Sequence, residues 1–183
     1  YDALERELSE RTHQDAPLFL PYLTGVNPPD FDPAARGAFL NLQLRHDRVD
    51  LAYAVMEGVA HLLHRNLLHL SDHGQPADAI VSAGGGTASG FWNQLKADAC
   101  ALDLHVPEEP EAACRGAALL ALTAAGALDA FDDTDPPHRP AATTYRPRET
   151  DARSIRYQAF DAALRQLSGR DGRTPIKERG QDR

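Results

Sequence analysis

Residues 80–92 read Ile-Val-Ser-Ala-Gly-Gly-Gly-Thr-Ala-Ser-Gly-Phe-Trp, which is an apolar run, a glycine turn and the start of a helical pattern. This order predicts a strand, a tight turn and the start of a helix. Glycines let the backbone adopt positive φ and let a ligand come close, because they carry no Cβ. The free N–H groups at the start of the following helix, together with the positive end of its dipole, can bind a phosphate group. We therefore expect Gly84, Gly85 and Gly86 to contact a nucleotide.

Two other interpretations of this turn stay open. It could join a strand to a helix without binding any ligand. Residues 84–90 also match G-x-G-x-x-x-G, one residue longer than the usual dinucleotide-binding motif. The acidic residue expected about twenty positions later in that motif could only be Asp103 or Glu108, so a dinucleotide-dependent oxidoreductase rests on a weak match. The chain has no G-x-x-x-x-G-K-[ST] pattern, which excludes a P-loop.

The composition is typical of a folded intracellular protein. The 183 residues are 42% hydrophobic and 25% charged, which is ordinary for a domain with a core. The formal net charge of -8 argues against nucleic-acid binding, which needs a basic surface. Cys100 and Cys114 lie in apolar segments and are expected to be reduced core thiols. The longest apolar stretch, residues 116–128, is too short to span a bilayer, and no apolar targeting segment opens the chain. We expect a cytoplasmic protein without membrane contact.

Helical and extended patterns alternate along the chain. Helices are expected at residues 1–14, 47–72, 89–102, 111–125 and from 151 onward, and strands at 18–23, 79–83 and 104–107. Asp47 should cap the long helix, with Asp50 adding negative charge to its first turn. The buried face of that helix is predicted from apolar residues at three and four spacing: Ala52, Val55, Met56, Val59, Leu63, Leu67 and Leu70. The order predicts an α/β fold with parallel strands and crossover helices.

Composition also predicts the domain limits. Residues 1–128 should form one domain, residues 129–150 a linker rich in Asp, Pro and Thr, residues 151–167 a C-terminal helix on the same domain, and residues 168–183 a disordered tail. Few strands are visible for a parallel sheet, so we expect further strands before Tyr1 or on a partner. The chain has no initiating Met and starts inside an apparent helix, which predicts that it is part of something longer.

The other chemistry-bearing residues favour structural roles. The histidines complete no H-E-x-x-H pattern, so we expect no metal site. Asp30, Asp32 and Arg36 lie in a proline-rich loop and are expected to brace it. No Ser/His/Asp or Cys/His nucleophile arrangement can be assembled from the spacing.

Three stretches in series carry a family resemblance. The first is residues 19–25 with residues 31–39, which contain Asp-Pro-Ala-Ala-Arg-Gly. The second is residues 84–89, followed by Trp92, Gln94, Ala97 and Asp98. The third is Glu111, followed by Gly-Ala-Ala at residues 116–118. In order and spacing they resemble the C-terminal domain of the FGGY-type carbohydrate kinases, the group of xylulokinase, glycerol kinase and gluconate kinase. With Tyr145-Arg146-Pro147 and the last helix, the resemblance covers residues 17–167.

The resemblance implies an actin-like, ribonuclease-H-like ATPase fold. This chain would be the incomplete second domain of a two-domain kinase, without its first strands, and ATP would lie in the cleft between the domains. The enzyme would transfer the γ-phosphoryl group of ATP to a sugar or polyol hydroxyl, with xylulose favoured over gluconate and glycerol. Gly84, Gly85 and Gly86 would approach the phosphates and ribose, and Ser89 would face the adenosine side. Mg²⁺ would bind through the nucleotide.

The resemblance also implies what this chain lacks. The general-base aspartate and the sugar-contacting residues are expected in the missing N-terminal domain, which would be the partner of this chain, so the isolated segment is expected to be inactive. Asp32 and Arg36 would stiffen a loop near the cleft. The segment 26–30 departs from the commoner G-E-R-x-P form, and Arg115 stands where many members carry an apolar residue. A non-catalytic actin-like nucleotide-binding module stays open as the alternative, and a homodimer stays open as the oligomeric state.

Overall fold

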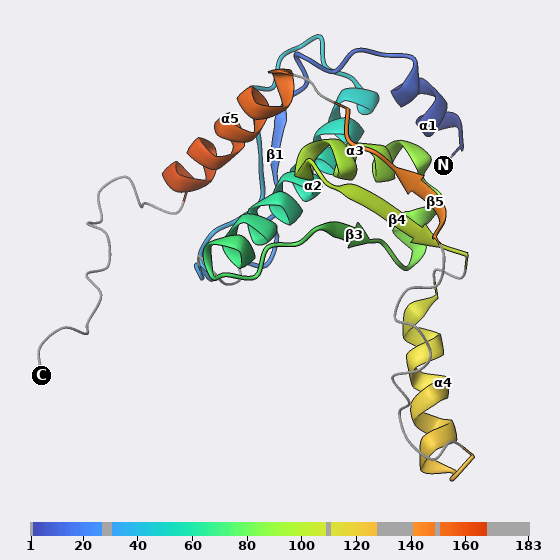
Figure 1. Ribbon diagram of the computed structural model, residues 1–183. Coiled ribbons are helices and arrows are strands. Elements are labelled where there is room, and N and C mark those ends of the chain that lie inside the picture. Colours follow the sequence, from blue (N-terminus) through green and yellow to red (C-terminus); the bar gives the residue numbers. More distant parts are fainter. Residues whose placement is uncertain (1, 27–30, 109–110, 128–140, 149–150, 168–183) are drawn as a thin grey trace, which may run out of the picture.

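Two small sheets and a long helix organise the described residues of this computed structural model, which are 2–26, 31–108, 111–127, 141–148 and 151–167 (Figure 1). The helices and strands are, in chain order, α1 (Asp2–Ser9), β1 (Leu18–Leu20), β2 (Ala38–Leu40), α2 (Arg48–Asp72), β3 (Ala79–Val81), a 3-10 turn (Gly85–Ala88), α3 (Gly90–Cys100), β4 (Asp103–Pro107), α4 (Ala112–Ala124), β5 (Ala141–Tyr145) and α5 (Asp151–Leu167). Helix α2 packs against both α3 and β1, and so links the two sheets.

The larger sheet confirms the predicted crossover unit. Strands β3 and β4 pair in parallel, with Ile80 opposite Leu104, and α3 is the crossover between them. Strands β1 and β2 form a separate antiparallel pair. Parallel strands of one sheet need such a crossover, because a short hairpin cannot connect them.

Strand β5 lies within residues 129–150, the segment that composition predicts to be a linker. Residues 141–145 pair antiparallel with β4, and Thr144 contacts His105 through its hydroxyl at 2.9 Å. Thr and Tyr favour strands, but five residues beside a Pro- and Asp-rich segment give too short a pattern to recognise. Residues 128–140 and the expected tail at 168–183 lie outside the described residues, and the domain limits stay predictions.

Helix α2 begins as its sequence predicts. The Asp47 carboxylate accepts hydrogen bonds from the backbone N–H groups of Val49 and Asp50 at 2.8 and 3.3 Å. Asp50 in turn accepts from the Asp47 N–H at 2.9 Å, which completes a capping box. Helix α2 ends at His73 and Gly74, where φ is 76°.

The predicted buried face of α2 is wrong. The buried residues of this helix are Val49, Ala54, Glu57, Gly58, Ala60 and His61, and they include none of the seven apolar residues expected. Val55 and Leu70 are exposed instead. The backbone of β1 crosses α2 so closely that a Cβ at Gly58 would lie 2.3 Å from the Phe19 carbonyl oxygen. The packed face therefore combines small apolar residues with a glycine, a glutamate and a histidine, and a periodicity of large apolar residues does not find it.

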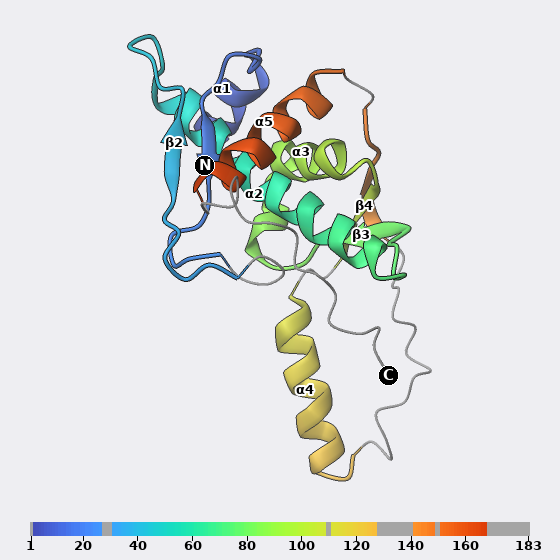
Figure 2. The same cartoon turned by 90° about the vertical axis from the view of Figure 1, so that its left-hand side faces the viewer.

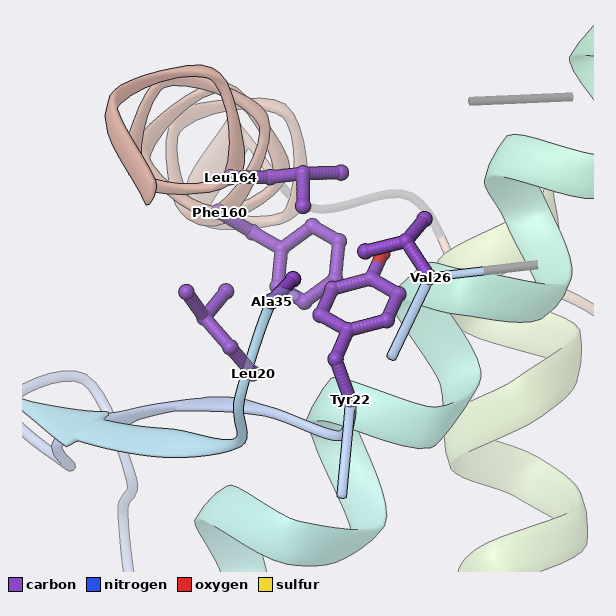
Figure 3. Packing of buried hydrophobic residues seen from close by; sticks show 6 residues of the cluster. All are labelled: Leu20, Tyr22, Val26, Ala35, Phe160 and Leu164. Carbon is purple, nitrogen blue, oxygen red and sulfur yellow. The ribbon is translucent and has the colours of Figure 1, made fainter. Parts of the chain in front are cut away.

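The principal core lies between the N-terminal segment and α5. Phe160 and Leu164 of α5 point toward side chains that come from β1 and the loop after it (Figure 3). All six residues of this cluster are buried: Leu20, Tyr22, Val26, Ala35, Phe160 and Leu164. The C-terminal helix thus packs on the same body as the first forty residues.

Helix α4 stands away from the rest of the described chain in both views (Figures 1 and 2). None of its residues is buried, and Leu120 is 62% exposed. Cys114 of this helix is exposed, which corrects its assignment as a core thiol, whereas Cys100 is buried as expected. A helix that is apolar all round is normally buried, so α4 has the composition of a covered helix without a cover among the described residues.

The helices of the described segments are each too short or too polar to cross a lipid bilayer.

Candidate functional site

The glycine turn lies at the carboxyl end of β3. The Ser82 N–H donates to the His105 carbonyl at 2.9 Å and so extends the parallel ladder to the edge of the turn. Gly84 has φ 82°, a conformation that favours glycine. The predicted order of strand, turn and helix is confirmed, with a 3-10 turn at residues 85–88 inserted before α3.

Two polar residues that sequence reasoning missed brace this turn. The Gly84 carbonyl accepts from both the N–H and the hydroxyl of Thr87, at 3.0 and 2.7 Å. The Thr87 carbonyl accepts from the side-chain amide of Asn93 at 2.8 Å, and Asn93 is fully buried. A threonine three residues after a glycine was the available signal, because its hydroxyl can bond back to a turn carbonyl. Hydrogen bonds within the chain therefore brace the turn.

The three glycines face different surroundings. Among the described residues, a Cβ placed at Gly84 or Gly85 would meet nothing within 4 Å, so this side of the turn is open to them. A Cβ at Gly86 would lie 3.2 Å from the Trp92 ring. The turn thus presents its first two glycines outward and rests its third on Trp92.

A cation lies beside the inner part of the turn. The Trp92 indole N–H donates to the Met56 carbonyl of α2 at 3.1 Å, which fixes the ring. The Lys96 ammonium stands 4.3 Å from the centroid of that ring, in a cation–π contact. Partial burial lowers the pKa of Lys96. An accessible glycine backbone with a positive charge close by suits an anionic ligand.

The sequence predicts free N–H groups for a phosphate at the start of α3, but two of these groups are bonded within the chain. Ser89 caps the helix by accepting from the Trp92 N–H at 3.1 Å. A carboxylate oxygen of Glu5, from α1, accepts from the Phe91 N–H at 2.7 Å and from the Ser89 hydroxyl at 3.3 Å. The chain therefore supplies its own anion at this helix end.

Two residues of the second family-like stretch hold the chain that follows β5. Gln94 donates to the Arg146 carbonyl and to the Asp98 carboxylate, each at 2.8 Å. Arg148 donates to Asp98 through its backbone N–H at 2.8 Å and through its guanidinium at 2.6 and 3.0 Å. Gln94 and Asp98 thus attach residues 146–148 to α3.

The proline-rich loop is braced as predicted. Asp32 accepts from the Ala34 N–H at 2.9 Å, and Arg36 donates to the carbonyls of Pro33 and Ala35 at 2.9 and 2.8 Å. These bonds stay within the loop and do not reach the glycine turn. Asp30 lies outside the described residues.

A buried ion pair joins α2 to α5. The Arg156 guanidinium donates to both oxygens of Glu57 at 2.5 Å, and also to the carbonyls of Gln14 and Ala16. Tyr53 donates to Glu57 at 3.2 Å, and burial raises the pKa of Tyr53. Breaking a buried ion pair is costly, because the remaining charge stays uncompensated.

His61 lies beside this ion pair. Its side chain is buried, and within the described part of the chain neither ring nitrogen has a hydrogen-bond partner. Its Nε2 is 3.8 Å from Glu57, and its ring contacts Tyr157 and Phe160. Burial lowers the pKa of His61 to about 4. No three His, Cys, Asp or Glu side chains of the described residues gather as metal ligands.

A model of the C-terminal domain of the FGGY family of carbohydrate kinases matches residues 2–125. The chain is 35% identical to a gluconokinase of Bacillus subtilis over 134 residues, which are 72% of this chain and 26% of that protein. It is 36% identical to a xylulose kinase of Staphylococcus epidermidis over 104 residues, or 57% of this chain and 21% of that protein.

The solved structures agree with these similarities. A xyloylose kinase from Brucella ovis superposes with a TM-score of 0.77 at 36% identity, covering 93% of this chain and 36% of that one. Plasmodium falciparum glycerol kinase, solved with ADP, shares the fold at a TM-score of 0.73 and 20% identity, covering 91% and 33%. The described chain therefore has the fold of one part of these actin-like ATPases, and it spans about a quarter to a third of their length.

Proposed function

This chain belongs to the FGGY family of carbohydrate kinases, and on that premise we propose that it is the ATP-binding part of an enzyme that phosphorylates a sugar or polyol hydroxyl. The observation that carries the proposal is the glycine turn at the end of β3, whose open side at Gly84 and Gly85 leaves the backbone accessible to a ligand. Bonds within the chain hold this turn in place, as a preorganised binding element requires.

Each residue of the turn has a distinct role in the proposal. The backbone of Gly84 and Gly85 would approach the phosphates and ribose of ATP, since no Cβ obstructs it. Gly86 would keep the turn seated on Trp92, and Ser89 would face the adenosine side. Lys96 would add positive charge beside the phosphates. Mg²⁺, bound through the nucleotide, would neutralise the charge that develops on the phosphates during transfer.

The remaining machinery of the proposed enzyme belongs to an N-terminal domain. Apolar helix α4 stands uncovered among the described residues, as expected of a surface that another part of a larger protein covers. The longer relatives support the same division. We assign the general base and the sugar contacts to that domain, and we place the enzyme in the cytoplasm, where ATP is supplied.

Xylulose is the proposed acceptor. It is supported by the match to the kinase from Brucella ovis along 93% of this chain. Gluconate is the second candidate, because the gluconokinase of Bacillus subtilis matches 72% of the chain at nearly the same identity.

A coupled assay of ADP release tests the proposal. The intact kinase that contains this chain is incubated with Mg-ATP and with xylulose, gluconate or glycerol in turn. One of these acceptors should give ATP-dependent phosphorylation, and the 183-residue chain alone should give none. Turnover by the chain alone would contradict the division of the machinery between two domains.

Two further titrations separate the alternatives. Calorimetric binding of Mg-ADP without phosphorylation of any sugar or polyol would support a non-catalytic nucleotide-binding module. Fluorescence titration with NADH should show no binding, and binding of NADH in place of Mg-ADP would support the oxidoreductase instead.

A further inference from the structure

Helix α1 places a carboxylate at the start of α3, next to the glycine turn. One oxygen of Glu5 accepts from the Phe91 N–H at 2.7 Å and from the Ser89 hydroxyl at 3.3 Å. The sequence separation exceeds eighty residues, so this contact belongs to the tertiary structure. We propose that Glu5 is a positioning residue for the nucleotide-binding turn, acting through Ser89 and the first turn of α3. This inference rests on the proposed function of that turn.

The hydrogen bonds to Glu5 are charge-assisted, because the acceptor is a carboxylate. An ionised acceptor makes shorter and stronger hydrogen bonds than a neutral one. The positive end of the α3 dipole favours a negative charge at this position. Glu5 also orients the Ser89 hydroxyl, whose oxygen accepts from the Trp92 N–H at 3.1 Å. The same carboxylate thus fixes the side chain that we assign to the adenosine side and the helix that follows it.

Glu5 is part of an enclosed contact. Its carboxylate and the Tyr145 hydroxyl of β5 lie 3.7 and 3.5 Å from the position that a Cβ at Gly90 would take. Helix α1 and strand β5 therefore both reach the start of α3 beside Gly90. An anion that bound the Phe91 N–H would have to displace Glu5.

Helix α1 is held in place independently of Glu5. Glu7 pairs with Arg48 at the start of α2, and Arg11, just after α1, pairs with Asp47 at 2.8 Å. Leu8 of α1 is fully buried. The Glu5 carboxylate is consequently presented to the turn by an anchored helix, and its loss need not release α1.

The consequence concerns where the nucleotide binds. A phosphate group cannot take the Phe91 N–H, because a carboxylate of like charge already does. Glu5 therefore directs the phosphates to the open side at Gly84 and Gly85, and it keeps Ser89 in one orientation for the adenosine. Removing Glu5 should loosen the site, although it touches no nucleotide atom.

The test compares variants of the intact kinase by calorimetry with Mg-ADP and by steady-state kinetics with ATP. Glu5→Ala should bind Mg-ADP roughly tenfold more weakly and raise KM for ATP, because one hydrogen bond to an ionised acceptor is lost. Its kcat should stay within about twofold, since the proton-accepting groups are elsewhere. Glu5→Gln keeps an acceptor oxygen but loses the charge, so it should restore only part of the affinity. Glu5→Asp keeps the charge but is one methylene shorter, so it should be weakened like Glu5→Ala, which covers the case that alanine unfolds the chain.

Glu7→Ala is the matched control, because it removes a carboxylate of the same helix that contacts Arg48 and not the turn. It should leave the affinity for Mg-ADP unchanged. If Glu5→Ala and Glu7→Ala lower the affinity for Mg-ADP equally, the affinity depends only on the docking of α1. If Glu5→Ala binds Mg-ADP more tightly, Glu5 competes with the nucleotide. Either result, or no change in Glu5→Ala, overturns this inference alone. Absence of Mg-ADP binding in the unsubstituted kinase overturns the proposed function, and this inference with it.

Discussion

Replacing His61 with phenylalanine should change how stability depends on pH. Both ring nitrogens of His61 lack hydrogen bonds within the described part of the chain, and its ring packs on Tyr157 and Phe160. A phenyl ring of similar shape removes two buried polar atoms that have no hydrogen-bond partner among the described residues. At pH 7.5 the variant should therefore be as stable as the unsubstituted chain, or slightly more stable.

The effect of acid follows from the pKa of His61 in the two states. Burial lowers the pKa to about 4 in the folded chain, from 6.5 in an unperturbed histidine. Between these two values the unfolded chain binds a proton that the folded chain does not, so stability falls as the pH falls through this range. The free energy of unfolding falls by about 1.36 kcal/mol for each pH unit below the unfolded pKa of 6.5. At pH 5 the accumulated loss is therefore about 2 kcal/mol.

Urea unfolding at pH 7.5 and at pH 5.0 measures this loss. The unsubstituted chain should lose about 2 kcal/mol more than His61→Phe between the two conditions, since other titrating groups contribute equally to both. His73→Gln, at the exposed end of α2, should behave like the unsubstituted chain. Equal losses in the unsubstituted chain and in His61→Phe would contradict this prediction, because His61 would then be able to take up its proton in the folded state.

Three other substitutions, one of them with a matched control, probe the turn, the buried ion pair and the core. Gly85→Val in the intact kinase should weaken Mg-ADP binding at least about tenfold with an unchanged Tm, because its Cβ meets nothing within 4 Å; calorimetry that found equal affinity would place the nucleotide elsewhere. Arg156→Met leaves Glu57 buried without this ion-pair partner and should lower the free energy of unfolding, measured in urea, by about 3–5 kcal/mol. The control Arg45→Met removes an exposed ion pair and should lower it by less than about 1 kcal/mol. Phe160→Ala should cost about 3–5 kcal/mol, and a loss below about 1 kcal/mol would mean that α5 is not part of the core.

Local chemistry could be predicted from the sequence. The capping box at Asp47 and Asp50 depends on two residues three positions apart, so the chain itself displays it. The strand, glycine turn and helix around Gly84 depend on neighbours in the same way. The crossover from β3 to β4 follows from the alternation of patterns.

Non-local packing could not be predicted. The buried face of α2 is set by the backbone of β1 against Gly58 and by the partner of Glu57 on α5, neither of which leaves a periodic signal. The carboxylate that accepts from the first turn of α3 comes from Glu5 of α1, which is distant in the sequence. A helix N-terminus looks the same in a sequence whether a ligand or a distant Glu5 fills it.

Arg156 of α5 donates to the carbonyls of Gln14 and Ala16, so residues from both ends of the described chain must be synthesised before this contact can form. The principal core joins Leu20 to Phe160, so it cannot close until nearly the whole segment has left the ribosome. Until then the apolar side chains of β1 and the loop after it lack their cover, and contacts this distant in sequence form slowly. A nascent chain that stops short of α5 should consequently depend on chaperones, even though the glycine turn and its strand are already complete.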